Sequence, residues 1–285
     1  MLTEASTRLV QLIHPREGRR VALVDGNRLH LLASYRSAYS FAKAAIELGW
    51  KLRDLLSTDL SGILLDYEET YRLATPWRFL ASFDHSEEPS RCLVSAAGPT
   101  RSEWSYLGSG NSLRGHGDIV PIPEETIEAE AMGDLASLYI ISPDGTPRRV
   151  GVSTSNGLRG PDFRVRSNVV GPELVLDPAV ASVEGSATVY RNDEPVWSKP
   201  LSSDGAPLLY ALAALEPDHF RYSDHHRPGD AHVHFIGARL FGERQNAKLQ
   251  DGDKCEVSWE GLGRPLMHSV KMDRGDEGRL VASPL

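Results

Sequence analysis

Short strand-like runs, separated by turns rich in Gly, Pro and Asp, fill the chain from Cys92 onward. Turn residues of this kind supply the backbone angles of tight reversals, and the apolar runs between them are typical of strands. One segment, Pro207–Leu215, is instead apolar throughout and starts with a proline, which favours a helix. The predicted strands are Leu135–Ile141, Arg148–Val152, Leu174–Leu176, Ala187–Tyr190, Val196–Ser198, Ala231–Ile236 and Cys255–Trp259. Many strands with few helices indicate a strand-rich α+β fold rather than a doubly wound sheet.

The first 90 residues have a different pattern. Arg20–Leu32 predicts a β-hairpin, because the Gly26-Asn27 pair between two apolar runs tolerates positive φ angles. Residues 37–49 carry apolar side chains at helical spacing and end on a glycine, which predicts a helix, and a second helix is expected within 50–74. We therefore predict a small N-terminal α+β domain over residues 1–90 and a larger β-rich domain over residues 91–285.

Composition and charge exclude several classes of function. The 285 residues have a net charge of -8 with acidic and basic residues interspersed, which gives no support for a nucleic-acid partner. No run approaches the length of a membrane-spanning helix, and no secretory signal is visible, so we expect a cytoplasmic protein with no membrane partner. Cys92 and Cys255 suit a reducing compartment, and we predict small buried apolar side chains rather than a disulfide or a catalytic thiol.

Two phrases near the C-terminus each join a turn to a strand: Arg227–Gly237 and Gly252–Leu266. Other phrases accompany them in a consistent order and spacing: Arg19–Asp25, Leu64–Tyr67, Arg91–Val94, Gly171–Leu174, Val196–Pro200 and Leu215–Phe220. Together they resemble the fumarylacetoacetate hydrolase superfamily, especially its sugar-acid branch, which acts on 2-keto-3-deoxy acids. The resemblance covers nearly the whole chain. It implies a fumarylacetoacetate hydrolase-like mixed β-roll core, with the catalytic domain over residues 91–285, usually as a homodimer that binds a 2-oxo acid through a divalent cation.

The resemblance further implies a trio of carboxylates for Mg²⁺, a hard cation that takes oxygen ligands. In the family, two acids in a Glu-x-Glu pattern precede a Pro-Asp-Gly turn, which is Pro143-Asp144-Gly145 here. Counting back from this turn gives Met132, which has no oxygen, and Asp134, whose side chain is one methylene shorter. Glu130 lies in a Glu-x-Glu pattern four residues early. The first two ligand positions therefore lack the family's glutamates, unless a shift of register places Glu130 at one of them.

The third acid and the general base of the family also have no clear counterpart. Gly160 stands where the family has an aspartate, and Asp162 replaces it only if the loop is shifted. Arg101 stands in the place of a histidine that supplies a general base, and an arginine cannot accept a proton at neutral pH. Arg164 and Arg166 fall near the family's active-site lysine. The hypothesis that follows is an anion bound directly by guanidinium groups without Mg²⁺; the alternative is that these arginines lie on a solvated loop.

Several other residues are candidates for the site. His232 and His234 are two apart in a predicted strand, so both imidazoles share one face, as a transition-metal site or a cupin-like site with Glu243 and His268 would require. The alternative is that they are core histidines. Further candidates are His219 beside Glu216 as an acid or base, Ser109 in a mobile lid, and the backbone N–H groups of Gly237 and Ala238 as ligands for a substrate carboxylate.

The prediction that combines these observations is a divergent member of the family. We expect a hydrolase, lyase or isomerase that acts on a small oxo-acid or β-dicarbonyl compound through an enolate-like state, without Mg²⁺, in specialised metabolism. Asp134, Arg101, Arg164 and His219 are the predicted catalytic residues, and Arg166, Gly237, Ala238 and Ser109 the predicted substrate-binding residues. Two alternatives stay open. One is a non-catalytic pseudoenzyme or structural subunit; the other is an Mg²⁺-dependent 2-keto-3-deoxy acid dehydratase or hydrolase that uses Asp134, Glu130 and Asp162.

Overall fold

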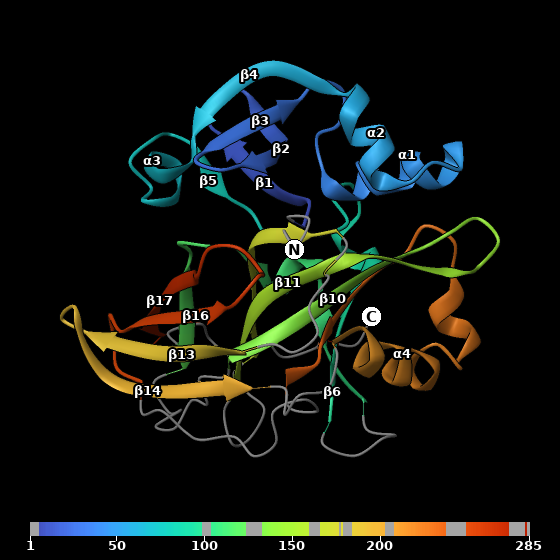
Figure 1. Ribbon diagram of the computed structural model, residues 1–285. Helices are drawn as coiled ribbons and strands as arrows, with labels where there is room; N and C mark the ends of the chain where they lie inside the picture. Colours follow the sequence, from blue (N-terminus) through green and yellow to red (C-terminus); the bar gives the residue numbers. More distant parts are fainter. Residues whose placement is uncertain are drawn as a thin grey trace.

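The computed structural model describes residues 6–98, 104–123, 133–159, 166–176, 178, 184–202, 208–237, 249–273 and 283. Its strands form two sheets, one of twelve strands and one of five. The described α-helices lie outside the sheets (Figure 1). Three belong to the N-terminal part, and the fourth, α4 (Leu208–His219), belongs to the second part of the chain. This is the strand-rich α+β architecture that the turn pattern predicts.

The N-terminal part contains an antiparallel run of strands and two helices that pack on it. Its elements are β1 (Arg8–His14), β2 (Gly18–Asp25), β3 (Arg28–Leu32), α1 (Ala38–Leu48), α2 (Leu52–Thr58), β4 (Leu60–Asp66), α3 (Tyr67–Tyr71) and β5 (Arg78–Phe79). The predicted hairpin is confirmed as β2 and β3, with Gly26 at a φ of 55° in the turn. The predicted helix is confirmed as α1, which ends at Gly49 with a φ of 67°, a left-handed conformation that favours glycine.

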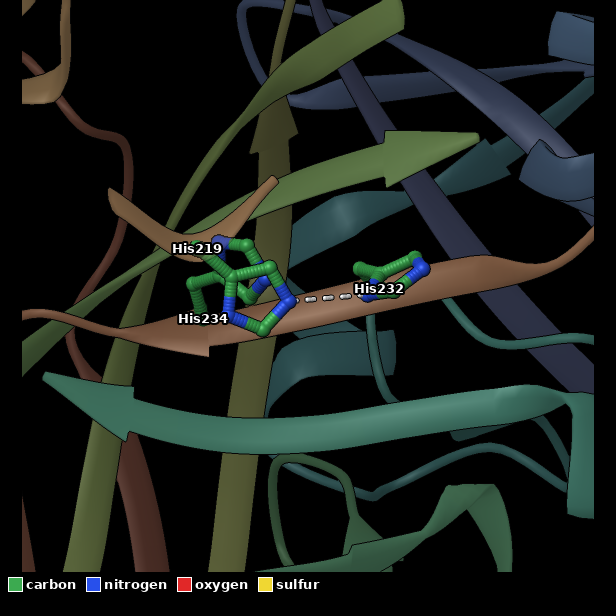
Figure 2. Close-up of side chains that lie close together, drawn as sticks. All are labelled: His219, His232 and His234. Carbon is green, nitrogen blue, oxygen red and sulfur yellow. Dashed lines mark hydrogen bonds between the residues drawn. The ribbon is translucent and has the colours of Figure 1, made fainter. Parts of the chain in front are cut away.

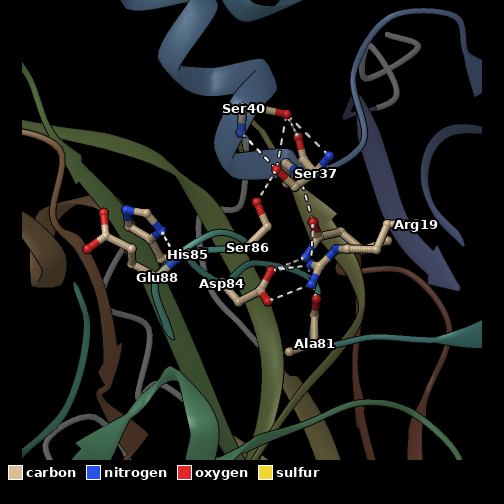
Figure 3. Close-up of polar contacts among 10 residues, drawn as sticks. Arg19, Ser37, Ser40, Ala81, Asp84, His85, Ser86 and Glu88 are labelled. Carbon is tan, nitrogen blue, oxygen red and sulfur yellow. Dashed lines mark hydrogen bonds and ion pairs between the residues drawn. The ribbon is translucent and has the colours of Figure 1, made fainter. Parts of the chain in front are cut away.

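Polar contacts at the start of α1 join this part to the connector that follows it (Figure 3). Ser37 and Ser40 form a capping box, in which each side chain accepts a hydrogen bond from the other's backbone N–H. The Arg19 guanidinium donates to both oxygens of Asp84, at 3.0 and 2.5 Å. Gln11 Nε2 donates to the Ala81 carbonyl at 2.6 Å, and its Oε1 accepts from the Ala38 N–H at 2.8 Å. These hydrogen bonds join β1, β2 and α1 to the connector.

The larger sheet runs from the N-terminal strands into the second part of the chain. Its order is β4-β3-β2-β1-β12-β11-β10-β15-β6-β7, with β5 beside β1 and β8 beside β12. The new strands are β6 (Cys92–Ala97), β7 (Trp104–Ser109), β8 (Leu113–Arg114), β10 (Gly133–Ile141), β11 (Pro147–Arg159), β12 (Arg166–Val175) and β15 (Ala231–Phe235). The link is the antiparallel pair β1–β12, with Arg8 opposite Val175. A domain boundary near residue 90 stays a prediction, because the sheet is continuous across it.

The five-stranded sheet packs against the β10–β11 side of the larger one (Figure 1). Its order is β14-β13-β16-β17-β9, made of β9 (Ile119–Pro123), β13 (Glu184–Arg191), β14 (Glu194–Ser202), β16 (Lys254–Trp259) and β17 (Leu266–Asp273). Asn192 and Asp193 turn between β13 and β14 with positive φ angles of 52° and 65°, the conformation of a tight two-residue hairpin turn. Apolar side chains of both sheets and of α4 share one buried cluster, which includes Leu135, Leu212 and Trp259.

Each predicted strand overlaps an observed strand, but only Ala231–Ile236 and Cys255–Trp259 agree to within one residue at both ends, and the others are longer than predicted. Arg148–Val152 is only the first half of β11, which continues to Arg159. The added residues include Ser153, Thr154, Ser155 and Asn156, all polar and all buried. A continuous polar run without apolar periodicity is typical of a loop, so the pattern does not predict a central strand there. Both cysteines are buried as predicted, and burial raises the pKa of each thiol to about 12.

A buried carboxylate connects the N-terminal strands to the core strands. Glu173 of β12 accepts hydrogen bonds from Arg8 Nη1 at 2.9 Å, from the Tyr67 hydroxyl at 2.6 Å and from the Arg264 N–H at 2.8 Å. Gly263 passes so close that a Cβ there would lie 2.4 Å from the carboxylate carbon. Because a buried charge is tolerated only when it is fully paired, this contact fixes the two parts relative to each other.

Among the described residues, no helix is both long and apolar enough to cross a membrane.

Candidate functional site

Asp134 lies buried near the start of β10, where this strand meets the end of β15. Its Oδ1 accepts the N–H of Leu135 at 2.8 Å and the N–H of Gly237, which follows β15. A Cβ on Gly237 would lie 2.5 Å from that oxygen, so glycine is needed for this approach. The carbonyl of Asp134 accepts the indole N–H of Trp259 at 3.0 Å. The structure thus brings together Asp134 and Gly237, two of the predicted site residues.

The described residues around Asp134 do not fit a magnesium site. Mg²⁺ in proteins is held by several oxygen ligands, with at least one or two carboxylates directed at one point. Asp134 belongs to no group of three His, Cys, Asp or Glu side chains within the described part of the chain. Its Oδ1 is also engaged by two backbone N–H groups. Nothing in the geometry of Asp134 therefore requires a cation.

Other predicted site residues fall outside the described residues, namely Arg101, Glu130, Asp162, Arg164, Ala238 and the cupin candidate Glu243. Arg166 is the first residue of β12, and only its backbone is described. Ser109 ends β7, where it pairs with Leu93, and its carbonyl accepts the Ser112 hydroxyl at 2.7 Å. The roles predicted for these residues stay predictions.

His219 contacts two other histidines rather than Asp134. It is the last residue of α4, and its Nε2 lies 3.3 Å from Nδ1 of His232 in β15. His234, two residues along the same strand, has its ring centroid 4.0 Å from that of His219. One nitrogen of each ring lies within 4.8 Å of the others (Figure 2). We call His219, His232 and His234 the histidine cluster.

The histidine cluster and Asp134 lie on opposite faces of the larger sheet. Side chains alternate along a strand, so His232 and His234 share one face of β15 while Val233 and Phe235 share the other. Phe235 pairs with Ala136, which is two residues from Asp134 and therefore on its face. The residue predicted as an acid or base, His219, is thus not placed to act on a substrate held at Asp134.

Burial controls the charge of the cluster. Loss of solvation lowers the pKa of His219 to about 2 and that of His232 to about 3, and it lowers the pKa of His234 well below its ordinary value. The neighbouring imidazoles add repulsion in the same direction. All three rings are therefore neutral at pH 7, each with a lone pair on one nitrogen.

Aromatic and polar side chains separate the cluster from solvent. Phe220 lies edge-on to His219 at 4.9 Å between centroids, and Tyr139 lies 4.8 Å from His234. The Tyr139 hydroxyl donates to Glu216 at 3.0 Å, and Glu216 also pairs with Arg149 at 2.6 Å. Tyr139, Phe220 and Glu216 form one wall of an open hollow of about 470 Å³. Glu216 thus faces this hollow rather than His219, its predicted partner.

A second hollow of about 320 Å³ lies where α1 approaches the turn at Pro228-Gly229. Lys43 and Arg91 line it together with Glu47, Glu87 and Glu88. Arg91 is already paired with Asp230 at 2.7 Å. Because its charges are mixed and partly neutralised, this hollow does not favour an anionic ligand.

Comparison with solved structures identifies the fold. The apo form of 2-keto-3-deoxy-D-arabinonate dehydratase superposes with a TM-score of 0.68 over 94% of this chain and 99% of that chain, at 14% identity. A second form of that dehydratase, complexed with magnesium and 2,5-dioxopentanoate, has a TM-score of 0.66 at 14% identity, with the same coverage. The 2-hydroxyhepta-2,4-diene-1,7-dioate isomerase of Mycobacterium marinum gives 0.62 at 15% identity, over 94% of this chain and 99% of that chain.

The chain has the fumarylacetoacetate hydrolase fold. No family model matches the sequence, and no curated protein matches it. The fold predicted from the order of the turn–strand phrases is thus confirmed over nearly the full length, although fewer than one residue in six is identical.

The sequence predicted two of the three residues of the histidine cluster as a pair, but not the third as their partner. The His232–His234 pair was recognised from its spacing, but its suggested partners were Glu243 and His268. His268 instead lies in β17 with its Nε2 2.9 Å from Asn156 Nδ2. The third histidine comes from the end of α4, and no spacing in the sequence indicates that this helix end packs on β15.

Proposed function

We propose that this protein is an enzyme that acts on a small oxo-acid or β-dicarbonyl compound through an enolate-like state, without Mg²⁺. The observation that carries the proposal is Asp134, fixed by the N–H of Gly237 at the junction of β10 and β15 in a chain that matches dehydratase and isomerase structures from end to end. The family position that would hold a cation thus carries a carboxylate engaged by the protein backbone.

The proposed roles follow from the chemistry of an enolate. A 2-oxo acid carries a carboxylate, and removal of a proton beside its carbonyl adds negative charge on the carbonyl oxygen. Guanidinium groups bind such paired oxygens in bidentate geometry and stay protonated throughout. We assign this role to Arg101, Arg164 and Arg166, with Ser109 and the backbone N–H of Ala238 completing the substrate contacts. The Gly237 N–H, which donates to Asp134, would contact the substrate as a shared, bifurcated donor. Asp134, which holds Gly237 through Oδ1, is the proposed acceptor of the substrate proton, in keeping with the catalytic role predicted for it.

A titration of thermal stability with oxalate, a mimic of the enolate of a 2-oxo acid, tests the proposal. A ligand that binds only the folded protein raises its Tm. We expect oxalate alone to raise Tm by several degrees, acetate to have little effect, and added Mg²⁺ to change nothing. Arg101→Gln removes the guanidinium and is expected to abolish the rise. Asp134→Asn keeps an oxygen acceptor for both backbone N–H groups and is expected to leave the rise largely unchanged.

Two other outcomes favour the competing functions. A Tm rise that requires oxalate and Mg²⁺ together favours an Mg²⁺-dependent 2-keto-3-deoxy acid dehydratase or hydrolase, for which Glu130 and Asp162 would join Asp134. No rise under any condition favours a non-catalytic pseudoenzyme or structural subunit.

Proton exchange separates an enzyme from a protein that only binds the anion. Formation of an enolate exchanges the C3 protons of a 2-oxo acid for deuterium in D2O, whichever bond is later broken or made. We expect the protein to accelerate this exchange in 2-oxobutyrate at least about a hundredfold over buffer, within the range of positioned acid–base catalysis, as followed by proton NMR. Oxalate stabilisation without accelerated exchange would contradict the proposed reaction.

We further propose, as expected from the sequence, that the protein is a cytoplasmic homodimer that acts in specialised metabolism and binds a small molecule.

A further inference from the structure

We propose that the histidine cluster binds a divalent transition-metal ion, with Zn²⁺ as the reference ion, through His219, His232 and His234. This site is separate from the proposed oxo-acid site, because it lies on the other face of the larger sheet. The proposal therefore does not depend on the proposed function.

The spacing of the nitrogens fits a metal. Two ligands that are each about 2.0–2.1 Å from Zn²⁺ at a tetrahedral angle lie about 3.3 Å apart. His219 Nε2 and His232 Nδ1 are 3.3 Å apart. The third ring has a nitrogen within 4.8 Å of the others, so a rotation of the His234 side chain that moves this nitrogen by up to about 1.5 Å completes three ligands.

The chemistry of the donors also fits. All three are imidazoles, and nitrogen ligands of this kind suit Zn²⁺, Ni²⁺, Cu²⁺ and Co²⁺ rather than Mg²⁺. Metals bind the neutral imidazole through the nitrogen that carries the lone pair, so the two nitrogens that now share a hydrogen bond would both have to be in their lone-pair tautomers when an ion enters. Three protein ligands leave a fourth position for water, the arrangement typical of a site with an open coordination position.

Unpaired buried atoms indicate that the cluster lacks a component. Among the described residues, His219 Nδ1, His232 Nε2 and His234 Nε2 are buried and have no hydrogen-bond partner. The same holds for Nε1 of Trp104, whose side chain lies 4.6 Å from the His219 ring and 4.8 Å from the His234 ring. Most buried polar groups in proteins are paired, so several orphaned atoms around one point require an explanation. An ion held by His219 Nε2 and His232 Nδ1 would take His234 Nε2 as its third ligand, and a water on the ion would offer an acceptor to Trp104 Nε1. His219 Nδ1 and His232 Nε2 are on the far side of their rings from such an ion.

The elements that carry the ligands give the ion a structural effect. His232 and His234 lie on β15, an interior strand of the larger sheet between β10 and β6, whereas His219 ends a helix. An ion would tie the end of α4 to β15. The hollow lined by Phe220 and Tyr139, two rings that contact the cluster, is the proposed route of entry.

The test uses the full chain after removal of metals with a chelator. Co²⁺ is added first, because a tetrahedral or five-coordinate nitrogen site gives visible absorption bands that free Co²⁺ lacks. We expect bands that saturate at one equivalent and disappear when Zn²⁺ displaces Co²⁺. We also expect Zn²⁺ at a hundredfold excess over its dissociation constant to raise Tm by roughly 5 °C.

Single substitutions assign the ligands. His232→Asn and His234→Asn are each expected to weaken Zn²⁺ binding at least tenfold and to remove the Co²⁺ bands. His226→Gln, which changes a histidine in the adjacent turn outside the cluster, is expected to leave both unchanged. If either variant fails to fold, the Co²⁺ bands and the Tm rise of the unsubstituted protein test the proposal. No visible bands and no Tm rise in that protein, or a Tm rise that survives both substitutions, would show that the cluster is a packed group of neutral imidazoles.

Discussion

Replacing Glu173 with alanine lowers the free energy of unfolding by about 3–5 kcal/mol, the usual effect of removing one partner from a buried charged network. The carboxylate is buried, and it accepts hydrogen bonds from Arg8, Tyr67 and the Arg264 backbone. Its loss leaves the Tyr67 hydroxyl and a backbone N–H without an acceptor, and it leaves the Arg8 guanidinium without its anion. Chemical denaturation monitored by circular dichroism measures the change.

Two further variants separate the contribution of the Glu173 charge to stability from the contribution of its size and from that of the other contacts of Arg264. Glu173→Gln keeps an oxygen for Tyr67 but turns an amide toward a guanidinium, so we expect a loss of about 1–3 kcal/mol, the cost of an unsatisfied buried group. Glu68→Gln removes an exposed partner of the same Arg264 side chain and is expected to change stability little. Equal losses in Glu173→Ala and Glu68→Gln would show that the buried carboxylate does not hold the two parts together.

Local patterns predicted the elements well because each has a local physical cause. The hairpin turn at Gly26 and the helix end at Gly49 require positive φ, and the sequence carries glycine at both. The second half of β11 was not predicted, because its buried Ser153 to Asn156 are polar. Their burial depends on partners from distant segments, such as Ser82, whose hydroxyl donates to Ser153 at 2.9 Å. Hydrophobic periodicity in the sequence does not identify such partners.

The candidate site was predictable only where a motif is contiguous. Asp134 and Gly237 were chosen by counting from turns that resemble a family, and the structure places them in contact. His232 and His234 were chosen from their strand spacing. His219 joins them through the packing of a helix end on a strand 13 residues later in the chain. That contact depends on the whole core cluster beneath α4, which no local pattern encodes.

Lowering the pH from 6.5 to 4 is expected to destabilise the folded protein through His116 by about 3 kcal/mol. The buried ring links the two parts of the chain: its Nε2–H donates to the Tyr71 carbonyl at 3.0 Å, and its Nδ1 accepts the Met267 N–H at 3.2 Å. A proton on Nδ1 would meet a donor, and burial lowers the pKa of His116 from an ordinary 6.5 to about 4, with a further contribution from the positive charge of Arg264. The unfolded chain therefore binds the proton first, so the stability is fully present above pH 6.5 and is lost as the pH falls toward 4.

The difference between two unfolding curves isolates this histidine from other acid-sensitive groups. His116→Asn retains an acceptor but cannot titrate, so its stability should fall less steeply between pH 6.5 and 4, by about 3 kcal/mol over the interval, in urea titrations with a chelator present. Tyr71→Phe removes the hydroxyl that donates to Pro265 but leaves the carbonyl that holds His116. It should lower stability at every pH without changing the slope. Parallel curves for His116→Asn and the unsubstituted protein would mean that His116 has the same pKa in the folded and unfolded chains. The contact between α3 and β17 would then not depend on a neutral His116 ring.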